Sequence, residues 1–137
     1  MRDILFRGKA IDDGKWVYGS LICAGSFVAI LQNEDDVHPT DYPYLDSQLG
    51  TIDGKATPID PSTIGQYIGL TDKNGKKIFE GDIVVNKEGT PYEVAFIEEY
   101  ARFAFKRKGV VFGWFNPKSA EIIGNIYDNP KLLEEIC

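Results

Sequence analysis

The chain has 137 residues, of which 43% are hydrophobic and 12% aromatic, and its 15 basic and 21 acidic residues give a net charge of −6. This composition excludes a disordered chain, and the length is that of one domain with its own core. The acidic balance disfavours attraction of the whole chain to nucleic acid or to an anionic membrane. No apolar run reaches the roughly 20 residues of a membrane helix, and no signal peptide follows Met1, so we expect a cytoplasmic protein.

The first 32 residues predict an antiparallel β-meander. Residues that favour strands occupy Ile4–Ala10, Trp16–Cys23 and Ser26–Gln32. Turn sequences separate them at Asp12–Lys15 and Ala24–Gly25, where glycine accepts positive φ. Three short strands joined by tight turns are typical of a meander.

Residues 33–63 predict a long, acidic, irregular segment, the excursion, which contains several prolines. Short extended pieces are expected near Tyr42–Leu45 and Thr51–Ile52. A loop of this length is uncommon inside a compact domain, so it either carries function or contains further short elements. Tyr42 and Tyr44 are candidate partner-binding residues, because aromatic side chains on loops make good anchors.

The remainder of the chain, residues 64–137, predicts a second run of short strands. Expected strands are 63–70, 78–85, 92–97, 101–106, 110–115 and 120–126. The pair Asn74-Gly75 predicts a type I′ hairpin turn, because both residue types accept positive φ. Gly81 predicts a bulge or bend within a strand, where Asp82 would accept hydrogen bonds from backbone donors.

The end of the chain predicts a change to helix. Asn129 is a suitable N-cap, and Pro130 suits the first helical position, so one or two helical turns are expected. The regular turns elsewhere favour an antiparallel sheet, barrel or sandwich over a parallel α/β arrangement.

The sequence offers little for catalysis or metal binding. His38 is the only histidine, and the two cysteines, Cys23 and Cys137, have no nearby partners, so we expect no metal site, no cofactor and no catalytic residue. Cys23 is expected to be buried apolar filler, and Cys137 a free thiol. Carboxylate pairs such as Glu80 and Asp82 keep a carboxylate-based enzyme as a minor alternative, although 21 acids produce such pairs by chance.

The segment Ala101–Lys108 interleaves phenylalanines with cations, and lysines of the 72–77 hairpin tip are expected near it. Exposed aromatics beside cations bind single-stranded nucleic acid by stacking and phosphate contacts. The alternative is a strand whose phenylalanines face the core while its cations face water. The candidate nucleic-acid-binding residues are Lys73, Lys76, Lys77, Arg102, Phe103, Phe105, Lys106, Arg107 and Lys108.

A second aromatic cluster follows Phe112. Trp114 and Phe115 are candidate partner-binding residues, as Tyr42 and Tyr44 are. Such aromatics also act as lids on a small core, and the sequence does not separate the two roles.

Three blocks, in order along the chain, resemble the YopX family. They are Met1–Gly8 (MRDILFRG), Ile64–Val84 (IGQYIGLTDKNGKKIFEGDIV) and Ile123–Leu133 (IGNIYDNPKLL). The resemblance implies a small protein encoded by bacteriophages and prophages that acts in the bacterial cytoplasm. It also implies a β-rich fold whose second half is an SH3-like small β-barrel. It implies no activity and transfers no catalytic or binding residue.

These inferences give a mainly β fold of the β-rich α+β type, with an antiparallel β-meander, an SH3-like small β-barrel and a short C-terminal helix. One domain, 1–137, would comprise the meander (1–32), the excursion (33–63) and the barrel-like part (64–137). We expect a non-enzymatic accessory protein that binds a host or phage protein, with single-stranded nucleic acid as the alternative and no membrane partner. An uncovered sheet edge would favour a homo-oligomer, whereas a closed barrel would allow a monomer.

Overall fold

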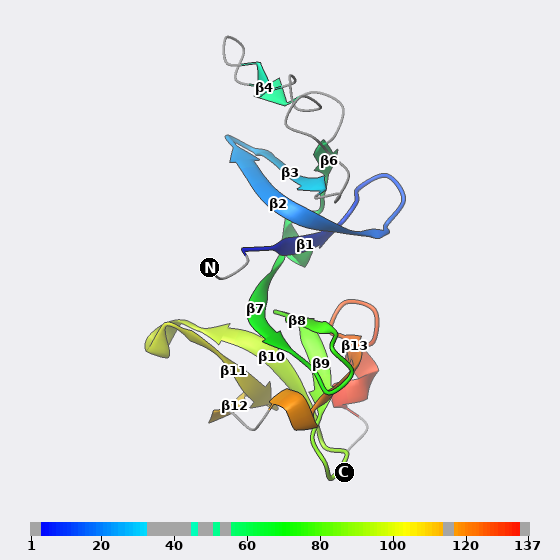
Figure 1. Cartoon of the computed structure of the whole chain (residues 1–137), viewed down its shortest axis with the longest axis vertical. Coiled ribbons are helices and arrows are strands. Elements are labelled where there is room, and N and C mark those ends of the chain that lie inside the picture. Colours follow the sequence, from blue (N-terminus) through cyan, green and yellow to red (C-terminus); the bar gives the residue numbers. More distant parts are fainter. Residues whose placement is uncertain (1–3, 33–44, 47–50, 53–55, 114–116, 135–137) are drawn as a thin grey trace. The chain divides into compact units, whose positions relative to one another are not determined.

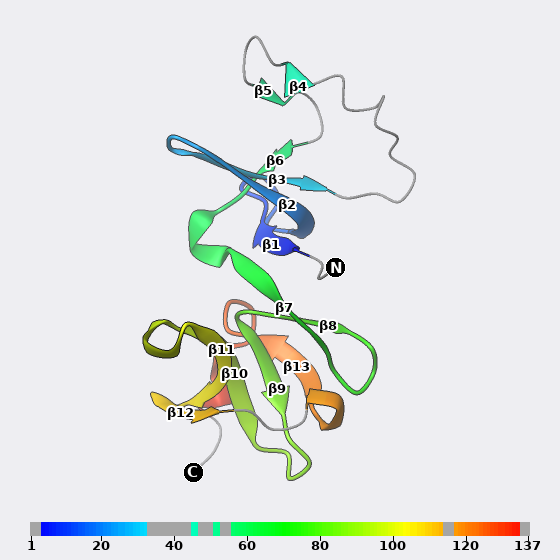
Figure 2. The ribbon, with the colours of Figure 1, turned by 60° about the vertical axis from the view of Figure 1, so that its left-hand side comes forward.

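The chain folds into two compact units, one spanning Ile4–Ile64 and one containing the residues from Gly65 onward. Both are built from antiparallel strands, which confirms the mainly β fold (Figures 1 and 2). The computed structural model describes residues 4–32, 45–46, 51–52, 56–113 and 117–134.

The first unit contains the predicted meander. Its strands are β1 (Phe6–Lys9), β2 (Trp16–Ala24), β3 (Phe27–Gln32) and β6 (Ala56–Pro58), in the order β6-β3-β2-β1. β6 was not predicted, because its short sequence lies within the excursion; it pairs with β3 through Ala56 to Pro58. The piece expected at Thr51–Ile52 is confirmed as β5, which pairs with β4 (Leu45–Asp46).

Cys23 is exposed, so its predicted burial was wrong. It lies one residue before the end of β2, where the β2–β3 hairpin turns. Ala24, Gly25 and Ser26 around this tip are exposed as well. An apolar strand sequence therefore does not imply burial where the hairpin extends past the core.

The second unit combines a hairpin with a five-stranded sheet. The hairpin strands are β7 (Gly65–Thr71) and β8 (Lys77–Phe79), and the sheet strands are β9 (Asp82–Val85), β10 (Pro91–Ile97), β11 (Arg102–Arg107), β12 (Val110–Gly113) and β13 (Glu121–Asn125). The sheet order is β12-β11-β10-β9-β13, with β9 between β10 and β13 (Figure 2). Among the described residues this order is open, with β12 and β13 at its two ends.

The hydrophobic cluster of this unit lies on one face of the five-stranded sheet. In the β10–β11 register Val94 pairs with Phe105, and both side chains are fully buried. The buried cluster consists of Ile78, Val84, Val94, Phe105 and Ala120, with Ile68, Tyr92 and Ile122 packed against it.

The strand predicted over 78–85 is divided by a bend, as Gly81 indicated. Gly81 has a φ of +94° and separates β8 from β9. The Asp82 carboxylate accepts a hydrogen bond from the Phe79 backbone N–H at 2.7 Å, and Asp82 is buried. The expected role of Asp82 at this bend is confirmed, because its side chain satisfies a buried donor that the interrupted ladder leaves.

The predicted type I′ turn at Asn74-Gly75 was wrong. Of these two residues, only Gly75 has positive φ, at +81°. The hairpin closes with a bond from the Asp72 N–H to the Lys76 carbonyl, and the Gly75 N–H donates to the Asp72 carbonyl. This is a three-residue loop in which glycine takes the left-handed position, so Asn74 needs no unusual conformation.

A two-residue hairpin turn of the primed kind occurs at Lys108-Gly109. Their φ angles are +51° and +79°, and the flanking residues Arg107 and Val110 are register partners of β11 and β12. Gly109 indicates a turn at this place in the sequence, but lysine is not a strong signal for positive φ, so the sequence does not identify the turn type.

The chain end forms a short 3₁₀ helix, Pro130–Leu133. Pro130 occupies its start as expected, but the Asn129 side chain does not cap it. The Asn129 side-chain oxygen instead accepts a hydrogen bond from the Asn125 N–H at 3.3 Å. In the part of the chain that the structure describes, no helix is long and apolar enough to cross a membrane.

Candidate functional site

The four aromatic residues predicted to bind a partner lie outside the described residues. They are Tyr42, Tyr44, Trp114 and Phe115. His38 and Cys137 lie outside them too. Within the described segments, no three His, Cys, Asp or Glu side chains converge as metal ligands would.

Phe105 belongs to the core, which corrects its predicted place in a nucleic-acid surface. Its side chain has no exposed area, so its ring offers no face on which a base could stack. Phe103, two residues earlier, is half-buried, and its ring meets Phe96 edge-on at a centroid distance of 5.3 Å. The alternation that places both rings on one face is therefore correct, but only Phe103 approaches the surface.

The cations of β11 have separate surroundings. The Arg102 guanidinium lies over the Tyr100 ring at 5.6 Å, whereas the Arg107 guanidinium donates to the Pro91 carbonyl at 3.2 Å. Lys106 is half-buried and is the register partner of Glu93. Lys108 forms part of the β11–β12 turn.

The hairpin lysines do not join these cations. The Lys73 N–H donates to the Ala120 carbonyl at 2.9 Å, and the Lys73 ammonium lies 3.7 Å from the Glu121 carboxylate, so the hairpin tip is held at β13. Lys76 and Lys77 are exposed on the same hairpin. β13 is three places from β11 in the sheet order, or about 14 Å at the usual strand spacing. The nine candidate residues therefore form two groups rather than one surface.

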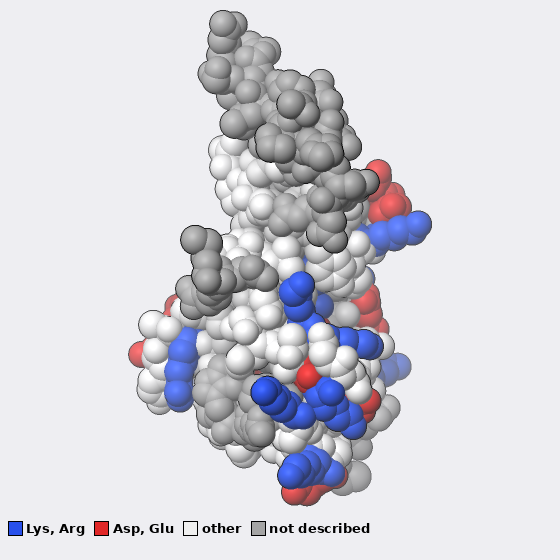
Figure 3. Space-filling view, viewed as in Figure 1, with Lys and Arg blue, Asp and Glu red and all other residues white. Residues whose placement is uncertain are grey.

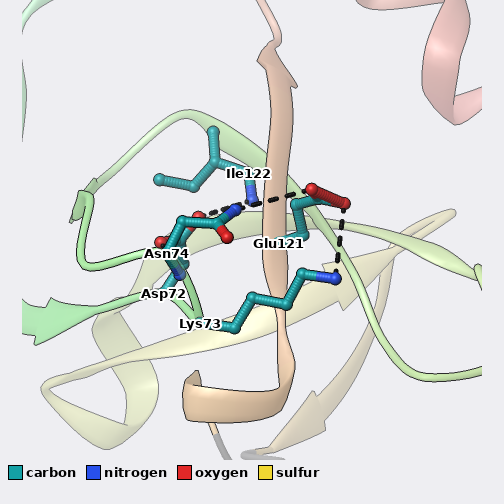
Figure 4. Close-up of polar contacts among 5 residues, drawn as sticks. All are labelled: Asp72, Lys73, Asn74, Glu121 and Ile122. Atoms are coloured by element: carbon teal, nitrogen blue, oxygen red, sulfur yellow. Dashed lines mark hydrogen bonds and ion pairs between the residues drawn. The ribbon is translucent and has the colours of Figure 1, made fainter.

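Asp72 holds the hairpin tip in place (Figure 4). One carboxylate oxygen accepts the backbone N–H groups of Asn74 at 2.8 Å and Lys76 at 2.9 Å. The other accepts the N–H of Ile122 in β13 at 3.1 Å. Burial raises the pKa of Asp72, but the N–H bonds of Ile122, Lys76 and Asn74, with the Lys76 charge, outweigh it, so this pKa is lowered overall.

Glu80 is the described carboxylate whose pKa is raised. Burial is the main cause, the Gln66 N–H bond opposes it, and the negative charge of Glu93 adds to it. Its neighbour in the predicted pair, Asp82, is engaged with the Phe79 N–H. The two carboxylates therefore accept different backbone N–H groups, that of Gln66 for Glu80 and that of Phe79 for Asp82.

Four exposed large apolar side chains mark a surface that the sequence did not predict. We define them as the apolar margin: Phe96 on β10, Tyr100 on the 3₁₀ turn Glu98–Tyr100, and Val110 and Phe112 on β12. Their exposed fractions are 43, 59, 55 and 54%, respectively. Strand alternation places Phe96 on the same face of the sheet as Val94. It does not reveal that Val94 is buried whereas Phe96 is exposed.

Phe112 owes its position to a β-bulge. Phe105 pairs with Gly113 and Lys106 with Val111, so Phe112 is the extra residue of β12. Its ring meets Tyr92 edge-on at 5.3 Å. Phe112 therefore packs on Tyr92, which borders the core, while Phe112 itself stays 54% exposed.

The comparisons with known proteins place this two-unit, β-rich chain in a family. The profile of the YopX protein family matches residues 5–134, so the chain belongs to the YopX family. Among solved structures, it is similar to protein EF1440 from Enterococcus faecalis, with 25% identity and a TM-score of 0.60 over 97% of this chain and 99% of that one. No curated protein matches the chain.

Proposed function

We propose that this protein is a non-enzymatic accessory protein that binds a host or phage protein through the apolar margin. The observation that carries the proposal is the exposure of Phe96, Tyr100, Val110 and Phe112, on β10, the turn after it and β12, all in one unit. Exposed apolar patches with polar surroundings are typical of protein interaction sites, and aromatic side chains are favoured anchors in them.

The mode of binding that we propose is addition of a partner strand to β12. This strand ends the sheet order on its side, and its only sheet neighbour among the described strands is β11. Val110 and Phe112, two residues apart, are both exposed on it. An added strand would pair with the outer backbone groups of β12, while these side chains would supply specificity.

Membership of the YopX family supports the biological setting that we propose for this protein. We infer a protein of phage or prophage origin that acts in the cytoplasm of its bacterial host. We also infer that the five-stranded sheet, with the β7–β8 hairpin over its core face, is an SH3-like small barrel with a short C-terminal helical turn. Small barrels often serve as interaction modules, which is an argument by analogy of fold.

Single-stranded nucleic acid is the second candidate ligand. The observation in its favour is the position of Arg102 over Tyr100, with the Phe96–Phe103 ring pair at the same end of the β10–β11 hairpin. Bases stack on such rings, and the guanidinium adds charge for phosphate. With Phe105 buried and the hairpin lysines near β13, this surface is smaller than the sequence suggested.

The test uses two variants that place charge on opposite ends of the same sheet. Val110→Lys/Phe112→Lys changes β12, and Ile123→Lys changes β13, where Ile123 is 39% exposed. Tagged wild type, incubated with nuclease-treated lysate of the bacterial host, should retain a specific protein that the β12 variant loses and the β13 variant keeps. Equal retention by all three proteins would refute the proposed surface.

Two further readouts separate the alternatives. Fluorescence anisotropy with a labelled 20-nucleotide oligo-dT should give the same result for wild type and for Arg102→Glu/Tyr100→Ala. Binding that this variant loses would favour the second candidate. Light scattering on the purified protein should give a monomer mass. A dimer that Val110→Lys/Phe112→Lys dissociates would identify a second copy of this chain as the occupant of β12.

A further inference from the structure

An open groove of about 610 Å³ lies in the second unit, at the β13 end of the five-stranded sheet rather than at the apolar margin. Three of its lining residues are lysines, and one is an acid. Figure 3 shows lysine and arginine side chains gathered over this unit. The groove is lined by Lys73, Val85, Asn86, Lys87, Gly89, Lys118, Ser119 and Glu121.

Two hairpin loops that border the groove have the same construction, Asp72–Lys76 and Asn86–Thr90. In each, the first residue's N–H donates to the fifth residue's carbonyl, and the N–H of the glycine at position four donates to the first residue's carbonyl. The side-chain oxygen of the first residue accepts the N–H groups of the third and fifth residues. These distances are 2.8 and 2.9 Å for Asp72, and 3.1 and 3.0 Å for Asn86.

The shared construction places a lysine at the second position of each loop. Lys73 and Lys87 are therefore presented by backbone that four hydrogen bonds fix, and both are exposed. Lys118 comes from the 3₁₀ turn Pro117–Ser119, which precedes β13. Three separate elements thus contribute lysines to the lining of one groove, although the chain as a whole is acidic.

The chemistry of the lining favours a phosphate-bearing anion. Lysine ammonium groups bind phosphate oxygens as point charges, without the directional fork of arginine. None of the described residues that line the groove is aromatic, so the lining favours contacts with phosphates over stacking on a ring. The volume lies within the roughly 300–1,000 Å³ that is usual for small-molecule sites.

The backbone beside the groove is not available to an acidic peptide strand. The Ile122 N–H already donates to Asp72, and the Ala120 carbonyl accepts the Lys73 N–H. A peptide would have to bind through its carboxylates alone, since strand pairing with this stretch of β13 is blocked. A polyphosphate needs no such pairing, because its charges are closely spaced.

We propose that the groove bordered by Lys73, Lys87 and Lys118 binds closely spaced phosphate groups, as in a free polyphosphate or a nucleic-acid backbone. Glu121 sets its affinity. The Lys73–Glu121 ion pair, at 3.7 Å with 49 and 41% of the side chains exposed, is weak and yields to a stronger anion. The site is independent of the apolar margin, so a protein partner and a phosphate ligand would bind the same molecule at different places.

The experiment is a ¹H–¹⁵N NMR titration of the full chain with sodium tripolyphosphate in one arm and 20-nucleotide oligo-dT in the other. The Gly75 and Gly89 amides should shift on binding, whereas the Gly109 amide, in the β11–β12 turn, should not. Shifts with both probes would indicate a general phosphate site. Shifts with tripolyphosphate alone would identify free polyphosphate, and shifts with oligo-dT alone a nucleic-acid backbone.

Charge variants supply the matched controls. Lys73→Glu/Lys87→Glu should weaken binding by roughly tenfold or more, whereas Lys15→Glu/Lys131→Glu, with the same change in net charge at exposed sites outside the groove, should leave it nearly unchanged. Glu121→Gln should strengthen it. For oligo-dT bound by three lysines, the slope of log affinity against log salt should be about −2. The substituted lysines are exposed and Glu121 is half-buried, so the HSQC spectra of these variants should show a folded protein.

Three results would overturn the proposal. One is the absence of loop shifts with either phosphate probe at low salt. Another is an equal loss of affinity in the groove and control variants, which would mean a net-charge effect. The third is binding of poly-glutamate in the groove when neither phosphate probe binds.

Discussion

The apolar margin and the groove bordered by Lys73, Lys87 and Lys118 lie in the same unit but arise in different ways. At the margin, Phe96 continues the sheet face of the buried Val94 on β10, and Phe112 is the bulge residue of β12. The groove depends on loops, because hydrogen bonds from Asp72 and Asn86 fix where their neighbouring lysines stand. Substitutions in the core should mainly lower stability, whereas substitutions at the margin or in the groove should mainly weaken binding.

The largest expected effect is that of Phe105→Ala. Removing a fully buried ring should lower the free energy of unfolding by about 3–5 kcal/mol, because transfer and cavity costs add. Urea unfolding followed by intrinsic fluorescence would measure it. A loss below about 1 kcal/mol would mean that Phe105 is not a core residue.

Phe112→Ala is the matched control on the same sheet. Phe112 is 54% exposed, so its removal should cost about 1 kcal/mol or less, mostly from the Tyr92 ring contact. Equal losses for the two variants would remove the distinction between the core face and its margin.

The next effect in size is that of Asp72→Ala. The change leaves the N–H groups of Asn74, Lys76 and Ile122 without their carboxylate acceptor, and should cost about 1–3 kcal/mol. Asn86→Ala should cost less, because the Asn86 side-chain oxygen accepts N–H groups from its own loop only. Thermal unfolding of both variants provides the comparison, and a smaller loss for Asp72→Ala would contradict the assigned role of its bond to β13.

The smallest effect concerns the pH dependence at Glu80. Because the pKa of Glu80 is raised in the folded protein, its contribution to stability is fully present below its unfolded value of about 4.3 and is lost as pH rises through the folded value. Glu80→Gln, which cannot ionise, should therefore gain stability relative to wild type between pH 4 and pH 7. Urea unfolding at these two pH values measures the difference in free energy of unfolding between Glu80→Gln and wild type. A difference that falls between pH 4 and pH 7 would contradict the expected sign.

The fold was largely predictable because local signals agree with it. Alternating apolar residues located β10 and β11, and Gly81 located the bend before β9. The turn at Asn74-Gly75 was in the correct place but of another type, since Asp72, rather than the conformation of Asn74, organises the loop. That side-chain bonding depends on the whole hairpin and cannot be predicted from the Asn74-Gly75 dipeptide.

The candidate surfaces were less predictable, because exposure depends on where neighbouring elements end. Alternation groups Phe103 with Phe105, yet one is half-buried and the other fully buried. The hairpin lysines were expected beside β11, but Asp72 and Lys73 attach their loop to β13. Sequence spacing within one strand does not report the order of strands in a sheet.

The most direct test of the proposed function is hydrogen–deuterium exchange on the protein with and without the partner that it retains. If that partner adds a strand to β12, the amides of Val110–Gly113 should gain protection while those of the Asp72–Lys76 loop stay unchanged. Protection confined to the loop or to β13, with β12 unaffected, would contradict the account.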